Sequence, residues 1–310
     1  MNQPLDLTVM MYHYVHDPGD EAEAGSGIPG MSTKVFTTQL DELAKRHTFV
    51  TWQDVRMALL DESLLPTSAC LLTFDDGVCD HYLNVFPILR NRNLSGLFFM
   101  LDRSGDDELV LAHKIHFLLA RLGLPGLREA LLEKLNTMQQ KKFTQAEESY
   151  QPKYPGATLD SQTNLLKAVL QRDLSMEINP LLSELFEAHI GSEAEMASRY
   201  YLNPEQLREM SAGGMHFGGH SRNHPWFDWI DAGARDREVR ASAECLRQFE
   251  SEPWAFAYPY GGLSDDSPRI LKQHGFIAAF TTRTQLTHTD PYYIGRLDGE
   301  EMVQDGQGYD

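Results

Sequence analysis

Short apolar runs alternate with amphipathic stretches over both ends of this 310-residue chain. A strand that is buried on both faces has a continuous apolar run, whereas a helix that covers a sheet has apolar residues at i, i+3, i+4 and i+7. The runs predict strands at 7–14, 69–74, 96–101, 215–219, 254–258, 278–281 and 293–297. The amphipathic stretches predict helices at 37–45, 81–92, 204–212, 234–249 and 266–274. This repeated order is typical of an α/β fold with a parallel sheet.

The stretch from 105 to 201 departs from this alternation of strands and helices. Helical patterns occupy it at 110–122, 127–135, 165–174 and 178–190. In the first of them, apolar residues recur at helical spacing, at Ile115, Leu118, Leu119 and Leu122. We therefore predict an inserted helical subdomain at 105–201, and a main domain formed by 1–104 and 202–310. The insertion would be a lid or a dimerisation surface, which makes a homo-oligomer possible. His113 and His116 are expected on a solvated helix face.

Two adjacent carboxylates, Asp75 and Asp76, end the apolar run at 69–74 and are followed by Gly77. Successive side chains on a strand point to opposite faces, so the strand must end here for both to reach one site. One carboxylate could then face a metal ion while the other faces a reacting water. The alternative is an ordinary turn, because Asp-Asp-Gly also favours turns.

A pair of histidines, His220 and His224, follows two glycines at the end of the predicted strand 215–219. Their spacing predicts that both imidazoles lie on one side of a single helical turn, where they could share a cation. One carboxylate oxygen and two imidazole nitrogens would supply three ligands and leave positions for water and substrate. The alternative is that His220 caps a turn and His224 lies on the surface.

A third candidate element for the site follows the predicted strand 254–258, in the sequence Tyr258-Pro259-Tyr260-Gly261. Backbone N–H groups in this loop could stabilise an oxyanion beside a metal ion. The alternative is a simple strand-to-loop turn with aromatic packing.

These three elements, in this order, resemble the polysaccharide deacetylase family, the NodB-like enzymes of carbohydrate esterase family 4. Thr73-Phe74-Asp75-Asp76-Gly77 is similar to the family's first motif, His220 to His224 to its second, and Tyr258 to Gly261 to a variant of its third. The resemblance covers about 5–104 and 203–298, and it implies a distorted (β/α) barrel.

The resemblance also implies roles for individual residues. Asp75 would be the general base, and Asp76, His220 and His224 would bind one divalent metal ion. The backbone N–H of Tyr260 would help to stabilise the oxyanion. Zn²⁺ suits these ligands best, although Co²⁺, Ni²⁺, Fe²⁺ and Mn²⁺ also fit them.

The sequence departs from the family's pattern at the third motif. Ala257 stands where many members have an arginine that orients the catalytic aspartate. We hypothesise that Arg296, in the last predicted strand, takes this role. The alternative is a surface pair between Arg296 and Asp298 or Asp290.

The general acid has two candidates. His288 lies in a Leu-Thr-His sequence that matches a C-terminal motif of the family, but a solvated loop is the alternative there. His13 ends the first apolar run and would face the same rim as Asp75, unless it is a packing histidine. The sequence does not choose between them.

The resemblance implies a metal-dependent hydrolase that removes an N-acetyl group from an acetamido sugar, in a cell-surface polysaccharide or a glycoconjugate precursor. A second interpretation is the same metal site acting on a formamide or a non-sugar amide. A third is a catalytically silent sugar-binding or scaffold protein.

Composition bounds the partners and the location. The formal net charge of −18 argues against nucleic acid and anionic membrane surfaces. The first residues show no signal peptide, and no run approaches the roughly 20 apolar residues of a membrane span. Three cysteines without C-x-x-C spacing predict reduced thiols, so we expect a cytoplasmic protein.

Overall fold

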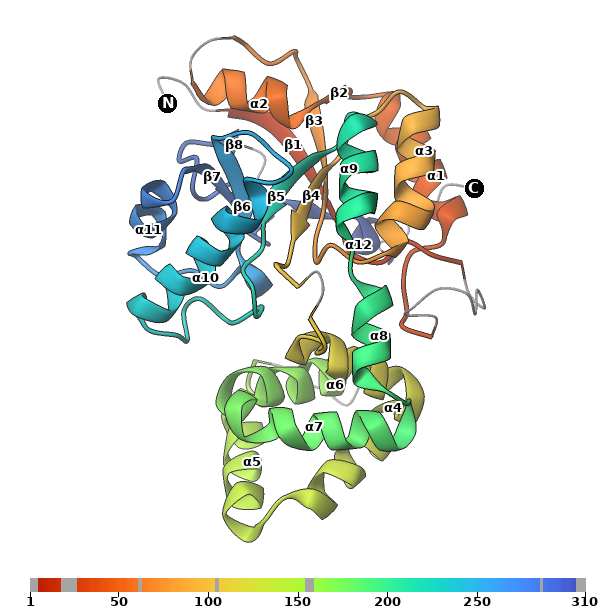
Figure 1. Cartoon of the computed structure of the whole chain (residues 1–310), viewed down its shortest axis with the longest axis vertical. Helices are drawn as coiled ribbons and strands as arrows, with labels where there is room; N and C mark the ends of the chain where they lie inside the picture. The colour runs from red at the N-terminus through yellow and green to blue at the C-terminus, as the bar shows by residue number, and fades with distance from the viewer. Residues whose placement is uncertain are drawn as a thin grey trace. The chain divides into compact units, whose positions relative to one another are not determined.

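The chain divides into two compact units (Figure 1). The first comprises Met1–Ala24, Gly30–Ser104 and Arg199–Asp310, and the second comprises Gly25–Pro29 and Gly105–Ser198. The computed structural model describes residues 5–17, 27–60, 63–103, 106–153, 159–284 and 287–304. Within these ranges, the helices are all too short or too polar to cross a bilayer.

A parallel sheet forms the centre of the first unit. Six strands follow one another in the spatial order β7-β6-β5-β4-β3-β1. They are β1 (Leu5–Tyr12), β3 (Ala69–Phe74), β4 (Leu97–Met100), β5 (His216–Gly219), β6 (Trp254–Ala257) and β7 (Phe276–Phe280). The short strand β2 (Thr48–Val50) also pairs in parallel with β3, and β8 (Thr287–His288) is antiparallel to β1. The apolar runs therefore locate the main strands, although β2 and β8 were not predicted.

The segment after β7 contacts both edges of this sheet. Ile294 forms a parallel bridge with Phe280 of β7, and β9 (Leu297–Asp298) pairs in parallel with Met10 and Met11 of β1. Since one short segment contacts the two outermost parallel strands, the sheet curls towards a closed barrel. The predicted distorted (β/α) barrel is confirmed. Only part of the strand predicted at 293–297 is regular, because this segment changes partner from β7 to β1.

Both faces of the sheet are buried, which explains the continuous apolar runs. On one face, Leu72, Phe74 and Phe98 belong to a core shared with the covering helices. On the other face, Leu71 and Phe99 belong to a second core that also contains small side chains such as Ala257. Alternate residues of one strand therefore enter different cores.

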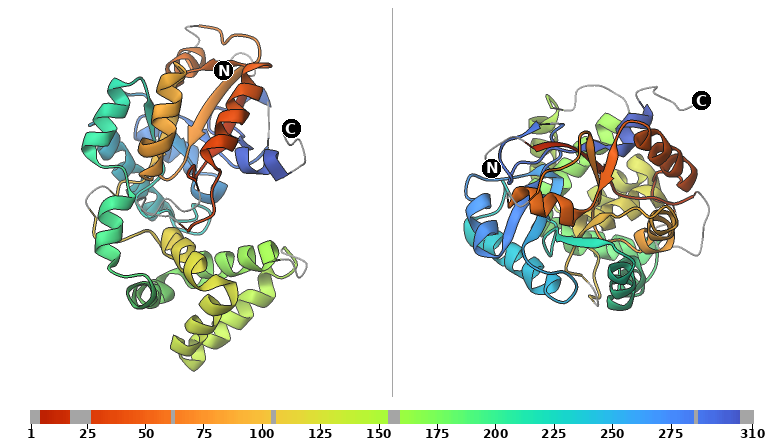
Figure 2. Two further views of the ribbon diagram at one scale, coloured as in Figure 1. Left: turned by 90° about the vertical axis from the view of Figure 1, so that its right-hand side faces the viewer. Right: turned by 90° about the horizontal axis from the view of Figure 1, so that it is seen from above.

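Helices surround this sheet (Figures 1 and 2). They are α1 (Thr33–Ala44), α2 (Trp52–Leu59), the π-helix η1 (His81–Val85), α3 (Phe86–Asn91), α9 (Pro204–Ala212), α10 (Ala232–Leu246), the 3₁₀-helix η3 (Pro259–Gly261), α11 (Ser267–Gln273) and α12 (Gly299–Gln304). Several begin at the expected capping residues: Ser32, Asn203 and Asp231 each accept a backbone N–H of the first turn. The helix predicted at 81–92 is instead a π-helical turn followed by α3.

The second unit is helical. It contains α4 (Leu111–Lys134), α5 (Thr137–Tyr150), α6 (Leu159–Ala168), the π-helix η2 (Val169–Asp173), α7 (Ser175–His189) and most of α8 (Glu193–Tyr200). Its helices enclose a core of their own, which includes Ile115, Leu118 and Leu182. The expectation that His113 faces solvent is wrong, because its side chain is fully buried.

A buried charge network also joins the helices of the second unit. Lys114 has no exposed surface, and its Nζ lies 2.8 Å from Glu193 Oε1. The same ammonium donates to Asn179 Oδ1 at 3.0 Å and to Ser183 Oγ at 2.8 Å. Because a buried ammonium needs several acceptors, these contacts fix α4 against α7 and the start of α8.

Candidate metal centre and active site

The polar residues singled out from the sequence follow the carboxyl ends of neighbouring parallel strands. Asp75 and Asp76 come directly after β3, His220 comes directly after β5, and Tyr260 lies in η3, which follows β6. Parallel strands present their carboxyl ends at one rim of a barrel, which is where such folds gather functional groups. The fold therefore brings residues that are far apart in the sequence to one place.

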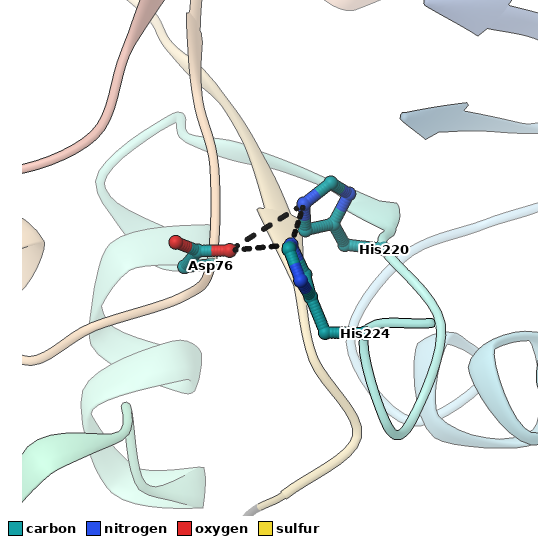
Figure 3. Close-up of side chains that lie close together, drawn as sticks. All are labelled: Asp76, His220 and His224. Atoms are coloured by element: carbon teal, nitrogen blue, oxygen red, sulfur yellow. Dashed lines mark hydrogen bonds and ion pairs between the residues drawn. The ribbon is translucent and has the colours of Figure 1, made fainter. Parts of the chain in front are cut away.

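Asp76, His220 and His224 form one compact group of possible ligand atoms (Figure 3). Asp76 Oδ1 lies 3.4 Å from Nε2 of His220 and 3.4 Å from Nε2 of His224. The two Nε2 atoms are 3.2 Å apart. Ligands at the corners of a tetrahedron about 2.0–2.1 Å from a zinc ion would lie about 3.3 Å from one another. The three atoms therefore fit one face of a tetrahedral metal site.

The partner of His220 sets the orientation of its ring. His220 Nδ1 lies 2.8 Å from the carbonyl oxygen of Ala257. A carbonyl can only accept, so Nδ1 carries a hydrogen and Nε2 is the ring nitrogen that faces Asp76 and would bind a metal ion. Burial lowers the pKa of His220, but the charges of Asp75 and Asp76 outweigh burial and raise it above its ordinary value. The site thus favours positive charge.

The backbone is unusual around these side chains. Asp76, Ser221, His224 and Tyr260 all have positive φ, at 76°, 69°, 54° and 57°. Non-glycine residues adopt this region at an energetic cost, and those that do often cluster at functional sites. The helical turn predicted for His220 and His224 is wrong: residues 220–224 form a loop in which the N–H of His224 donates to Ser221 Oγ at 3.0 Å.

Asp75 is held by Arg296 inside the barrel. Two guanidinium nitrogens, Nη1 and Nη2, donate to Oδ1 and Oδ2 of Asp75, each at 2.7 Å. Nη1 also lies 3.3 Å from Thr73 Oγ1, Nε donates to the carbonyl of Thr281 at 3.2 Å, and the guanidinium carbon lies 5.5 Å from the ring centre of Phe99. Arg296 therefore pairs with Asp75, and not with Asp290 or Asp298 on the surface.

This pair keeps Asp75 charged although it is buried. Burial raises the pKa of Asp75, but the Arg296 guanidinium, with smaller contributions from His220 and His13, outweighs burial and holds that pKa below its ordinary value. The bidentate contact also fixes the plane of the carboxylate. Asp75 is thus an ionised and oriented group beside the Asp76 and histidine cluster.

The two candidates for a general acid lie at different ends of β1. Nε2 of His13 is 3.9 Å from Asp75 Oδ2, and its side chain is 36% exposed, so it borders the site and remains accessible. The backbone of His288 pairs with Leu5, at the amino end of the strand, far from the rim at Tyr12. The side chain of His288 lies outside the described residues. We therefore retain only His13 as a candidate acid.

The ring of Tyr260 packs between two aromatic neighbours of the site. Its centre lies 4.4 Å from the ring of His224, at 78°, and 4.4 Å from the ring of Trp226, at 12°. These contacts support the position of His224. The role of the Tyr260 backbone N–H stays a prediction.

The side chains that hold the residues next to His13 were not predicted from the sequence. Asp80, His81 and Asn84 all contact the backbone of 13–15. The only signal was their place shortly after Asp75-Asp76, in a stretch predicted as a regular helix.

Comparisons with known proteins agree with this architecture. The polysaccharide deacetylase family model matches residues 185–279, which include His220, His224 and Tyr260. There is no significant match among curated proteins. The deacetylase PplD of Streptococcus pyogenes, solved in complex with acetate, has a TM-score of 0.57 and 18% identity, over 97% of this chain and 98% of that one.

Two further solved structures are similar over nearly the whole length. IcaB from Ammonifex degensii has a TM-score of 0.56 and 20% identity, over 95% of this chain and 92% of its own. A de-N-acetylase from Aggregatibacter actinomycetemcomitans has a TM-score of 0.58 and 18% identity, over 96% of this chain and 98% of its own. The barrel and the rim of Asp and His side chains thus agree with the fold of these deacetylases. The resemblance to the polysaccharide deacetylase family is confirmed.

Proposed function

We propose that this protein is a metal-dependent hydrolase that removes the N-acetyl group from an acetamido sugar. The observation that carries the proposal is the ionised Asp75, held in a bidentate contact by Arg296, beside the three clustered ligand atoms of Asp76, His220 and His224. A protein that only binds sugar has no need of an oriented base next to a metal site.

The residues of the site divide the chemistry of amide hydrolysis between them. Asp76, His220 and His224 would hold one divalent ion, with Zn²⁺ as the best fit. When bound, such an ion acts as a Lewis acid and lowers the pKa of water. Asp75 would take the proton from the attacking water, because Arg296 keeps its carboxylate ionised and aimed at the site.

The remaining steps concern the oxyanion and the leaving amine. The backbone N–H of Tyr260 would donate to the carbonyl oxygen as its negative charge develops. His13 would then donate a proton to the departing sugar nitrogen, since it lies beside Asp75 and is partly exposed. Without that proton, the amine would leave as an unstable anion.

The expected substrate is an N-acetylated sugar in a polysaccharide or glycoconjugate precursor. Two of the similar structures support an acetyl group as the one removed: one is named a de-N-acetylase, and the other is a deacetylase solved with acetate. The family model that covers the two histidines is also named for polysaccharides.

The proposal is tested by product analysis. The wild-type protein, supplied with Zn²⁺ or Co²⁺, is incubated with N-acetylated hexosamine oligomers, and released acetate and formate are measured. Acetate release that Asp75→Asn abolishes while metal content stays constant is the expected result. Formate release from an N-formyl sugar alone would favour the second interpretation. Saturable sugar binding by wild type and Asp75→Asn, with no product from either, would favour a silent binding protein.

A further inference from the structure

The residues that follow β1 border the candidate site at His13. A general acid must lie within hydrogen-bond reach of the group that it protonates. The reach of an imidazole depends on the backbone that carries it, and an error of about 1 Å can cost about a hundredfold in rate. What holds the backbone of this segment therefore bears directly on catalysis.

Three side chains from one stretch hold this backbone at His13 and Val15. Asp80 Oδ2 accepts the N–H of Val15 at 3.0 Å, and Asn84 Nδ2 donates to the carbonyl oxygen of Val15 at 2.9 Å. His81 Nε2 lies 2.7 Å from the carbonyl oxygen of His13 itself. Since that oxygen can only accept, Nε2 of His81 carries the hydrogen and donates it.

The contact between Asp80 and Val15 is shielded from water. Asp80 is 4% exposed and His81 is fully buried. Oδ2 of Asp80 also lies 3.3 Å from Nδ1 of His16, and Oδ1 lies 3.8 Å from Nε2 of His81. A buried carboxylate that accepts the N–H of Val15 and lies beside His16 fixes the backbone more firmly than an exposed contact, because no water competes for the same groups.

The local backbone explains why one stretch can supply all three contacts. Residues 81–85 form a π-helical turn that the N–H of Phe86 closes on the carbonyl of His81. Such turns are rare, and they are frequent at functional sites. Here the turn lies between Asp80 and α3 and directs the side chains of residues 80, 81 and 84 to the same neighbouring segment.

We propose that Asp80 is a positioning residue for the general acid His13, assisted by His81 and Asn84; this rests on the proposed function. Asp80 touches none of the reacting atoms. It fixes the N–H of Val15, while His81 fixes the carbonyl of His13, so that the imidazole of His13 stays at the rim beside Asp75.

The test compares Asp80→Ala and Asp80→Asn with a matched control, Glu250→Ala. Glu250 makes the same kinds of contact at the amino end of β5: its Oε2 accepts the N–H of Phe217 at 3.3 Å and lies 3.0 Å from His216 Nδ1. Acetate release from an N-acetylated hexosamine oligomer gives kcat and KM. Metal content and melting temperature are measured for each variant.

Asp80→Ala is expected to lower kcat by about 10- to 100-fold, with KM and metal content unchanged, because general acid catalysis contributes about 10²–10⁴-fold. Asp80→Asn should recover most of this loss, since its amide oxygen still accepts the N–H of Val15. Glu250→Ala should lower the melting temperature but leave kcat within about twofold of wild type. In a His13→Ala background, Asp80→Ala should add less than about a twofold loss, because the positioned group is already gone.

Three results would overturn the proposal: an unchanged kcat for folded Asp80→Ala, a loss of metal that parallels the loss of activity, or losses that multiply in the His13 background. If Asp80→Ala does not fold, Asn84→Ala is measured in its place, with a smaller loss of kcat expected by the same logic. Wild-type protein that releases no acetate would instead overturn the proposed function, so the two failures are distinct.

Discussion

Arg296 places a permanent positive charge against Asp75 in the interior of the barrel. Both residues are at most 2% exposed, and the contact is bidentate. Residues 71, 73 and 75 share one face of β3 and its extension, so Asp75 points to the inner core from which Arg296 reaches it. Asp76 points the other way, towards the two histidines. Asp76 follows the end of β3 with a positive φ of 76°, and this change of backbone direction separates the proposed base from the proposed metal ligand.

Arg296→Ala should lower turnover by about 100-fold and leave metal content unchanged, because Arg296 orients Asp75 but contacts none of the three metal ligands. The free energy of unfolding should fall by about 3–5 kcal/mol, since a buried carboxylate loses its partner. Turnover per folded protein, elemental analysis and urea unfolding measure these effects.

Arg235→Ala provides the control for this substitution. Arg235 is also a buried arginine, and it pairs with Asp266 at 2.9 Å. Arg235→Ala should lower the free energy of unfolding and leave turnover per folded molecule unchanged. Equal turnover in Arg296→Ala and wild type would contradict the orienting role of Arg296.

The sequence predicted which side chains gather at the site better than it predicted their contacts and backbone conformation. The pattern around Asp75 and His220 pointed to side chains that the structure brings together, because strand ends and polar residues are visible in the sequence. The Arg296 contact joins residues 221 positions apart, and only the curl of the sheet brings them together. The positive φ of Asp76, Ser221 and His224 has no local signal, since these residue types usually adopt other conformations.

Among the elements, β5 has only four residues, yet it carries His220 at its carboxyl end. Glu250 anchors its amino end by contacts with His216 Nδ1 and the N–H of Phe217. Burial raises the pKa of Glu250, but the hydrogen bond and charge of His216, together with two backbone N–H groups, outweigh burial and hold that pKa below its ordinary value. The ionised form therefore stabilises the fold.

Glu250→Gln should lower the free energy of unfolding by about 1 kcal/mol at pH 7, the size expected for a partly exposed ionic hydrogen bond. A carboxyl with a lowered folded-state pKa stabilises the protein above its unfolded-state pKa, about 4.3, and loses this effect as the pH falls further. The difference between variant and wild type should thus disappear by about pH 3. Urea unfolding of both proteins at several pH values measures it, and a difference that grows towards low pH would contradict the assignment.

Element types were predictable where packing is uniform. The main strands were found because both faces of the sheet are apolar, but β2 and β8 are too short to leave a pattern. The π-helix at 81–85 has only five residues, too few to show a periodicity different from that of an α-helix, so the sequence predicted a single regular helix. The loop at 220–224 was predicted as helical because i, i+4 spacing is compatible with either conformation.

On the scale of the whole molecule, the helical unit leaves the barrel after β4 and returns before β5, two strands that are paired neighbours. An insertion between adjacent strands need not disturb their register, because the paired residues of β4 and β5 lie before and after the insertion in the sequence. The second unit has a core of its own, so its helices carry apolar patterns of their own. In the sequence, these patterns interrupt the alternation of strands and helices. Its role as a lid or dimerisation surface stays a prediction, since charge and periodicity do not identify a partner.

The most direct test of the site as a whole is its metal content. Wild type and His220→Ala are purified identically without added metal and analysed for divalent ions. If Asp76, His220 and His224 bind the metal, wild type should contain about one divalent ion per chain, as expected for a three-ligand catalytic site, and the variant should lose it. Equal metal in both proteins, or none in wild type even after reconstitution, would contradict the assignment of Asp76, His220 and His224 as a metal site.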